Sequence, residues 1–245
     1  MLQRLLRTST FAFILAVSWV DTAPAEMGPC SEMSQDNFYC GEGVGAARTI
    51  PKTISPSHRL ALAWRLTNRP PTVKPYEGDP DLESLIVRIS DGAVLAKSHG
   101  VYWDLGDRYA PHRYVGAAWS PDSHFLVRTL GARDVSDSAD LFAFAGESGV
   151  TGPFNLITTI ERAARAAIEG KEAADKYLLN FSYQPHLTID NQGLLHANVF
   201  LTARDSTDEQ VYELTARVTQ SANSFDATVL SVSRYRGPYV SVTVH

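Results

Sequence analysis

Residues 117–127 read AAWSPDSHFLV, which places a short polar turn, SPDS, directly before an apolar run that is typical of a β-strand. Residues 55–64 read SPSHRLALAW and repeat the same arrangement of a Ser-Pro turn followed by an apolar run. Proline sets φ at the first turn position, and the hydroxyl of a neighbouring serine can bond to the turn backbone. The sequence therefore predicts two strands that each begin at a Ser-Pro turn.

Each of these strands is followed by a polar loop, a second apolar run and a tight turn. The second runs are residues 85–89, before Asp91-Gly92, and residues 141–144, before Glu147-Ser148-Gly149. A turn of this composition next to an apolar run is a hairpin signal. We therefore expect two similar hairpin units, offset by 56 to 65 residues.

The order Trp119-Ser120-Pro121-Asp122 before an apolar strand resembles the W-S-P-D-G signature of TolB-like and WD-type β-propeller blades. The resemblance covers residues 54–153; Ser123 stands where the signature usually has glycine, and Ile54 replaces the tryptophan in the first unit. Propellers close with typically four to eight blades, and the chain shows two such units. The resemblance implies either a propeller fragment completed by other strands or blade hairpins reused in an open sheet. It also implies a scaffold for binding and no particular chemistry.

A helix is predicted from Phe154 to Leu179, because apolar residues recur there at spacings of three and four. Pro153 is acceptable near a helix start, where no amide donor is needed. The stripe should cover one face of the sheet that the two hairpin units form. Its members are Leu156, Ile157, Ile160, Ala164, Ala167, Ile168, Ala174 and Leu178.

The C-terminal part alternates between apolar and polar residues and predicts an antiparallel meander, with strands at 187–189, 194–202, 211–219 and 225–235 and a further one at 239–244.

The expected fold class is therefore α+β, mainly antiparallel β, with two blade-like units, one long helix and a C-terminal meander. The expected segments are a signal peptide at 1–25, a disulfide-pinned loop at 26–53, the blade-like units at 54–153, the helix at 154–180 and the meander at 181–245, with 54–245 forming one domain.

The N-terminus has the three parts of a secretory signal. Arg4 and Arg7 form a basic region, residues 8–20 form a short apolar core, and Ala23-Pro24-Ala25 supplies small residues before the cleavage site. The core is shorter than the roughly 20 residues that a spanning helix needs. We expect cleavage after Ala25 and an exported, soluble protein, either periplasmic or secreted.

The chain has two cysteines, Cys30 and Cys40. An even pair in an exported protein usually forms a disulfide. A redox pair would favour Cys-x-x-Cys, and a metal site would want more ligands nearby, so a structural bridge is the preferred interpretation. No metal or other cofactor is expected.

The net charge of −5 lacks the excess of Lys and Arg that nucleic-acid binding requires, so nucleic acid is excluded as the main partner. The histidines show no His-Glu-x-x-His spacing, and no Gly-x-Ser-x-Gly is present. No catalytic residue is assigned from the sequence.

Residues 101–114, VYWDLGDRYAPHRY, are unusually aromatic for a connection between two hairpin units. Aromatic residues and Arg are the usual constituents of binding hot spots. The candidate binding residues are Trp103, Arg108, Tyr109 and His112. The alternative is that the aromatic side chains belong to the core and only the charged ones face water.

Two functions remain open at this point. The first is a non-catalytic exported module that binds a protein or a component of the cell envelope through its blade-like loops. The second is a hydrolase of the envelope that uses an Asp–His pair in the 103–112 loop, with Asp104 or Asp107 beside His112. The absence of every strong catalytic motif favours the binding module.

Overall fold

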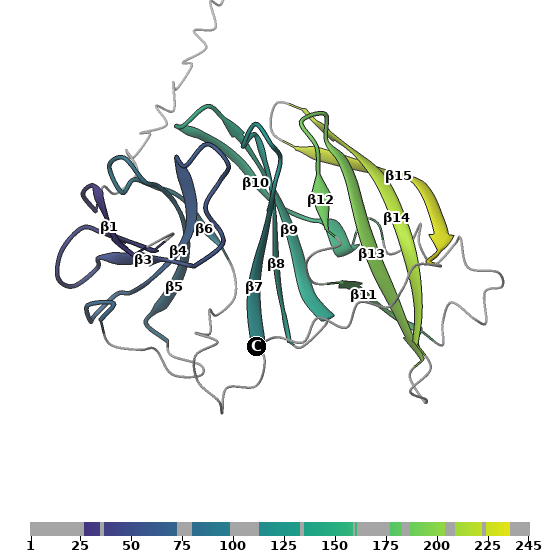
Figure 1. Cartoon of the computed structure of the whole chain (residues 1–245), viewed down its shortest axis with the longest axis horizontal. Coiled ribbons are helices and arrows are strands. Elements are labelled where there is room, and N and C mark those ends of the chain that lie inside the picture. The colour runs from purple at the N-terminus through teal and green to yellow at the C-terminus, as the bar shows by residue number, and fades with distance from the viewer. Residues whose placement is uncertain are drawn as a thin grey trace, which may run out of the picture.

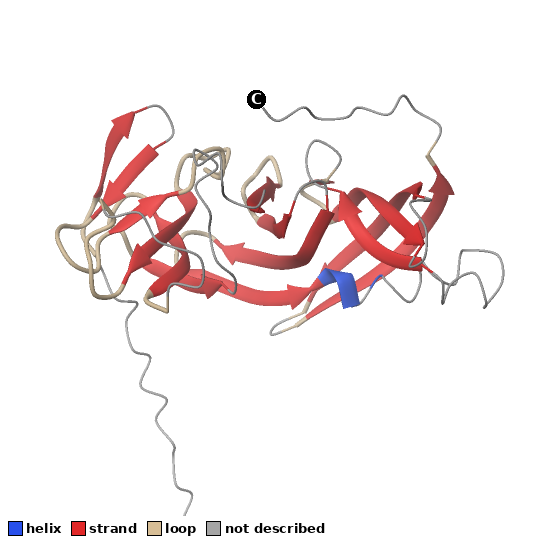
Figure 2. Cartoon of the chain, turned by 90° about the horizontal axis from the view of Figure 1, so that it is seen from below, coloured by secondary structure: helices blue, strands red, loops and turns tan. Residues whose placement is uncertain are grey.

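The computed structural model describes residues 27–34, 37–72, 80–98, 113–132, 135–158, 160, 177–182, 187–203, 209–221 and 224–235. These residues form fifteen strands in two antiparallel sheets. Figure 2 shows that strands are the dominant element of the described chain, joined by loops and turns, with one short helical segment.

The first sheet has six strands that follow one another in chain order. In β4, Leu60, Leu62 and Trp64 face the second sheet, and Ala61 and Ala63 pack into a smaller cluster on the opposite side. This alternation is the period of two that any strand imposes on its side chains. The strands are β1 (Cys30–Ser34), β2 (Asn37–Cys40), β3 (Ala47–Thr49), β4 (Leu60–Leu66), β5 (Leu82–Arg88) and β6 (Val94–Ser98).

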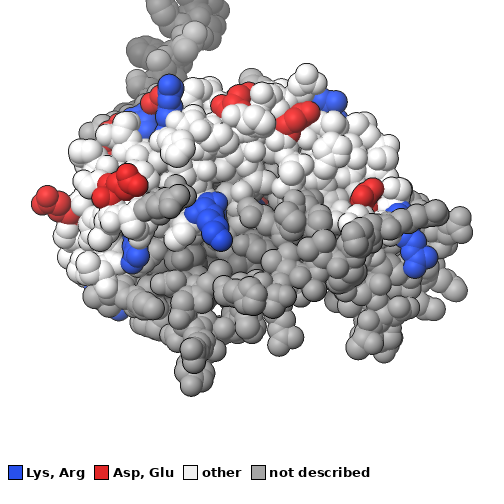
Figure 3. Space-filling model, viewed as in Figure 1, with Lys and Arg blue, Asp and Glu red and all other residues white. Residues whose placement is uncertain are grey.

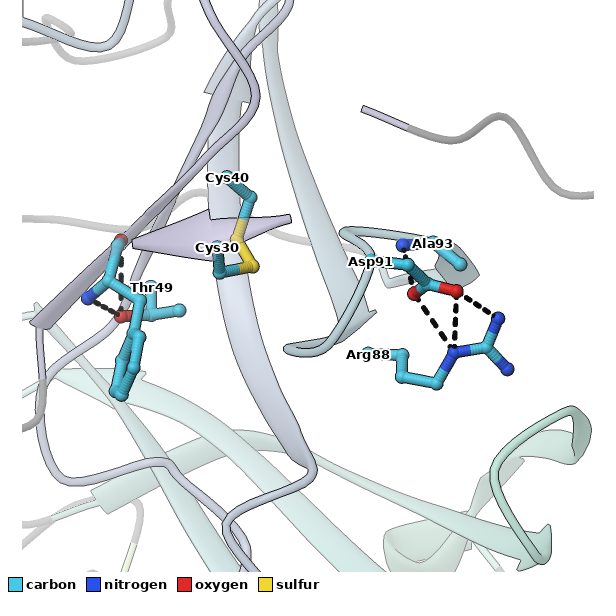
Figure 4. Close-up of a disulfide and its surroundings, with 7 residues drawn as sticks. Cys30, Cys40, Thr49, Arg88, Asp91 and Ala93 are labelled. Atoms are coloured by element: carbon cyan, nitrogen blue, oxygen red, sulfur yellow. Dashed lines mark hydrogen bonds and ion pairs between the residues drawn. A yellow bond between two sulfur atoms is a disulfide. The ribbon is translucent and has the colours of Figure 1, made fainter. Parts of the chain in front are cut away.

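The predicted disulfide is present and joins β1 to β2, where Cys30 and Cys40 are directly opposed (Figure 4). Cys40 is fully buried in the smaller cluster of the first sheet, and Cys30 packs against that cluster. The Cys30 N–H also donates to the Ile89 carbonyl at 3.1 Å. The bridge therefore ties the short edge hairpin to the rest of the first sheet.

The second sheet has nine strands, in the order β15-β14-β13-β11-β9-β8-β7, with β10 also paired to β9 and β12 to β13. Figure 1 shows its halves as two layers, β7 to β10 in the middle and β11 to β15 on the side away from the first sheet. The strands are β7 (Arg113–Trp119), β8 (Phe125–Ala132), β9 (Val135–Ala145), β10 (Gly149–Asn155), β11 (Tyr177–Ser182), β12 (Thr188–Ile189), β13 (Leu194–Ala203), β14 (Glu209–Gln220) and β15 (Phe225–Arg234).

The middle layer is packed on both faces, so its central strands carry buried side chains on both faces. Leu126 and Phe142 contact the cluster shared with the first sheet, whereas Val127 and Leu141 contact the cluster shared with β13 to β15. All four side chains are 0% exposed. This burial explains why β8 and β9 contain apolar residues at successive positions instead of alternating ones.

The predicted α+β class with a long helix is wrong. Phe154 and Asn155 lie in β10 and pair with Leu141 and Asp140, and the predicted C-terminal helical turn lies in β11, where Leu178 pairs with Thr202. Among the described residues only 156–158 and 160 are helical. Leu156 and Ile160 are both 0% exposed in the core, so their spacing reflects burial on one side of a single short turn. Ala164, Ala167, Ile168 and Ala174 lie outside the described residues.

The strands that the alternation predicted in the C-terminal part occur as β12 to β15, with Leu214, Ala216 and Val218 buried on one face. Direct pairing in the order β13, β14, β15 makes these strands a meander. The further strand predicted at 239–244 lies outside the described part of the chain. So does the predicted signal peptide at 1–25.

Candidate functional site

The site predicted from the sequence lies in a part of the chain that the structure does not describe. Trp103, Arg108, Tyr109 and His112 fall between the end of β6 at Ser98 and the start of β7 at Arg113. The Asp104, Asp107 and His112 of the alternative catalytic pair fall there too. Both hypotheses about this loop stay predictions.

The two Ser-Pro turns have equivalent backbone structure. The Leu60 N–H donates to Ser55 Oγ at 3.0 Å, and the Phe125 N–H donates to Ser120 Oγ at 2.8 Å. In both turns the fourth residue has a positive φ, 57° at His58 and 64° at Ser123. A positive φ is uncommon for residues other than glycine, so the two turns share an unusual backbone conformation. The sequence repeat is therefore also a repeat of turn geometry.

The equivalent turns lie against each other, although they belong to different sheets. The Ser57 N–H donates to Ser123 Oγ at 3.0 Å, and Trp119 Nε1 donates to the Thr53 carbonyl at 2.9 Å. The third layer reaches the same place, because the Asp122 N–H donates to Asn191 Oδ1 at 2.9 Å. Turns from all three layers thus meet at one end of the molecule.

Two arginines connect the turn between β9 and β10 to this group of turns. Arg59 forms an ion pair with Glu147 at 2.6 Å, and the two side chains are 65% and 42% exposed. Arg88 Nη1 donates to the Glu147 carbonyl at 2.8 Å. We call the resulting surface, made of Ser57, Arg59, Asp122, Ser123, His124 and Glu147, the turn surface.

A hollow of about 170 Å³ opens in the turn surface. Small-molecule pockets usually measure about 300–1,000 Å³, so this hollow is better matched to one inserted side chain. Its walls come from both sheets. They are formed by Ser57, Arg59, Leu60, Asp122, Ser123, His124, Phe144, Gly146 and Glu147.

Hydrogen bonds hold the polar groups of the hollow in place. Burial raises the pKa of the Asp122 carboxyl, but the Ser120 hydroxyl and the His124 N–H both donate to it, and the net pKa is below the usual value. His124 Nδ1 lies 2.7 Å from the Phe144 carbonyl oxygen. That oxygen can only accept, so Nδ1 carries the proton of this bond. Asp122 is thus a charged acceptor that two internal donors already engage.

The turn surface was not predicted as a site, although the Ser-Pro repeat that forms it was recognised. The repeat identified two turns but could not show that they meet, because contact between units about 65 residues apart depends on how the sheets pack. Within the described ranges, no group of three or more His, Cys, Asp or Glu side chains is arranged to hold a metal ion. No helix in the described part of the chain is long and apolar enough to cross a membrane.

Comparison with protein-family models and with curated proteins found no match for this chain.

Proposed function

We propose that this protein is exported and acts as a non-catalytic binding module that docks a protein or envelope component through the turn surface. The observation that carries the proposal is the Ser57–Ser123 hydrogen bond, which brings the loops of the two units into one surface with a shared hollow. Function often lies on loops that a rigid scaffold positions. Here the scaffold is a set of packed sheets with a buried middle layer.

The size and charge of the turn surface favour a macromolecular partner. The hollow accommodates one side chain, which is the scale of a hot-spot pocket in a protein interface. Arg59 and Glu147 place both signs of charge at its rim. Figure 3 likewise shows acidic and basic side chains interspersed over one face of the described surface. A partner of mixed charge fits this surface better than a polyanion does.

Export is supported by the signal-like N-terminus and by the disulfide. Disulfides persist in oxidising compartments and are rare where thiols are kept reduced. The Cys30–Cys40 bridge closes an edge hairpin that has little apolar core of its own. The resemblance to propeller blades also belongs to this proposal, because it implies a scaffold for binding.

Site-specific photo-crosslinking in cells that export the protein tests the docking surface. A photoreactive phenylalanine replaces Arg59 in one variant and Glu147 in another, and the matched control carries it at Thr228, an exposed position on β15. Loss of an exposed ion pair costs only about 0–1 kcal/mol, so both variants should fold. We expect one discrete crosslinked product from positions 59 and 147 and not from position 228.

The crosslinked partner, once purified, allows a quantitative second step. Arg59→Ala combined with Glu147→Ala should weaken its binding about tenfold or more while the melting temperature stays nearly unchanged. Equal crosslinking from all three positions, no crosslinking from positions 59 and 147, or an unchanged Kd in the double variant would contradict the proposal.

A further inference from the structure

A second hollow lies on the face of β12, β13 and β14 that points away from the main core. Its volume is about 430 Å³, within the range of about 300–1,000 Å³ that is usual for small-molecule sites. Figure 1 shows these three strands side by side in the C-terminal layer. The hollow is lined by Thr188, His196, Ala197, Asn198, Glu213, Leu214, Thr215 and Tyr235.

The strand register explains why the polar side chains gather here. Thr188 pairs with His196, which pairs in turn with Thr215, so these three form a row across β12, β13 and β14. Asn198 and Glu213 form the next row. Directly paired residues share a face of the sheet, and Cβ atoms in such pairs lie about 5 Å apart. Five hydrogen-bonding side chains therefore occupy adjacent positions on one face.

Asn198 is the most enclosed of these polar groups. It is only 7% exposed, and no hydrogen bond joins its side-chain amide to another residue in the described ranges. The amide is not among the fully buried side-chain groups that lack a partner; it lines the hollow, where a ligand can reach it. An amide in this position is suited to a ligand that supplies both a donor and an acceptor.

The neighbouring groups are arranged to complement that amide. The Glu213 carboxylate directly across from it accepts hydrogen bonds only, whereas the amide can both donate and accept. Thr215 Oγ1 lies 3.3 Å from His196 Nδ1, which orients the imidazole along the same row. Tyr235 lines the hollow from the end of β15 and brings an aromatic ring with a hydroxyl.

The charges of the lining select among ligand classes. Among the described residues that line the hollow there is no Lys or Arg, so a phosphate or carboxylate ligand would face Glu213 with no cation in that lining to compensate it. The two aliphatic lining residues, Ala197 and Leu214, belong to the main core and are 4% and 1% exposed. An apolar ligand would therefore cover polar groups without satisfying them. A neutral ligand rich in hydroxyl groups brings no negative charge next to Glu213, and it can hydrogen-bond to the polar side chains of the lining.

We propose that this hollow binds a neutral sugar unit, with vicinal hydroxyls bonded between the Asn198 amide and the Glu213 carboxylate and with Tyr235 beside the sugar ring. Each hydroxyl is both a donor and an acceptor, so a pair of them can bond to the amide and the carboxylate together. This site is separate from the turn surface and does not depend on the function proposed for it.

Isothermal titration of the mature, disulfide-bonded protein tests this site. The probes are glucose, galactose, N-acetylglucosamine, cellobiose and chitobiose, each at up to about 10 mM, which is ten times a millimolar Kd. Glucose 6-phosphate and glucuronate are the charged comparisons. We expect at least one neutral sugar to bind and the charged comparisons to bind more weakly. Failure of all neutral sugars to bind the folded protein, or stronger binding of a charged sugar, would overturn the proposal.

Variants then connect the binding to the hollow. Glu213→Gln and Asn198→Leu should each weaken sugar binding about tenfold or more, because each removes a hydrogen-bonding group. Glu32→Gln, at an exposed position on β1, is the matched control and should bind like the wild type. Glu213 is exposed, so its variant should fold even if Asn198→Leu does not. Undiminished binding in Glu213→Gln would place the sugar elsewhere and refute the assignment.

Discussion

Arg128 is buried in the middle layer beside an acidic partner. It is 1% exposed, and its Nη1 lies 3.3 Å from Asp140 Oδ2 on the neighbouring strand. Burial lowers the pKa of the guanidinium and the negative charge of Asp140 raises it, with burial the larger influence. Within the described residues, Arg128 Nη2 has no hydrogen-bond partner. The pair is therefore enclosed but incompletely satisfied.

Removing one partner of this pair should lower the free energy of unfolding strongly, whereas replacing both partners with apolar residues should not. Arg128→Met removes the cation that lies beside the buried Asp140 carboxylate and should lower the free energy of unfolding by about 3–5 kcal/mol. Arg128→Met combined with Asp140→Leu should recover most of that loss, because apolar replacements of buried ion pairs are often neutral or stabilising. Urea unfolding at neutral pH measures both variants. A single variant that costs under about 1 kcal/mol would show that water still reaches the pair.

Asp91 contributes stability that depends on pH. Arg88 Nε donates to its two oxygens at 2.9 and 3.0 Å, and this is the main cause of a pKa below the usual 3.8; the Ala93 N–H also lowers the pKa, and burial opposes the shift. A carboxyl whose pKa is lower in the folded state stabilises that state above its unfolded pKa. This stability is lost as the pH falls from about 3.8 through the folded pKa.

The wild type should consequently lose more unfolding free energy than Asp91→Asn between about pH 6 and pH 3. The asparagine keeps an acceptor for Ala93 but does not titrate, so the difference isolates this carboxyl. Urea unfolding at the two pH values provides the comparison. Equal losses in the two proteins would mean that Asp91 has the same pKa folded and unfolded.

The segment after β10 illustrates how the elements depend on their neighbours. A long helix was predicted there, yet the described residues contain one short helical turn followed, beyond an undescribed stretch, by β11. Pairing of residues 154–155 with β9 and of 177–181 with β13 satisfies their backbone groups in strands. Tertiary pairing of this kind routinely overrides local helix preference.

Ile160 tests how that short turn contributes to the core. It is fully buried with Leu156 in the cluster between the middle and C-terminal layers. Ile160→Asp should cost several kcal/mol, because it places an uncompensated charge in an apolar site. The control is Ile157→Asp. Ile157 is only half-buried, so this variant should lose less unfolding free energy. A loss below about 1 kcal/mol for Ile160→Asp, measured by urea unfolding, would mean that the turn does not pack there.

At the scale of the whole molecule, export and the disulfide can be tested together. We predict that the exported protein begins at Glu26 and contains the Cys30–Cys40 bridge. Intact-mass analysis with and without reductant reports both features in one measurement. The entropic model for a loop of this length assigns the bridge about 2–3 kcal/mol, so Cys30→Ala with Cys40→Ala should lower unfolding free energy by about that amount. Free thiols in the exported, folded protein would refute the bridge.

The local structural features of this chain could be predicted from the amino-acid sequence alone. Ser-Pro turns, an Asp-Gly turn and the alternation in residues 187–235 depend on neighbours within a few positions, and the strands and turns lie close to where they were expected. The disulfide could also be predicted, because two cysteines allow only one pairing. The candidate binding segment at 101–114 remains a prediction, since residues 101–112, which include all four candidate binding residues, lie outside the described residues.

Contacts between distant units were decided by the tertiary structure. Whether Leu156 and Ile160 continue a helix, whether the Ser57 and Ser123 turns touch, and whether Arg128 is buried all depend on which sheet faces pack together. Asn198 and Glu213 share a hollow only because β13 and β14 pair in one register among many. A shift of one residue would send one of them to the core face. Sequence spacing carries the period of a strand, whereas register and packing arise from the sum of many long-range contacts.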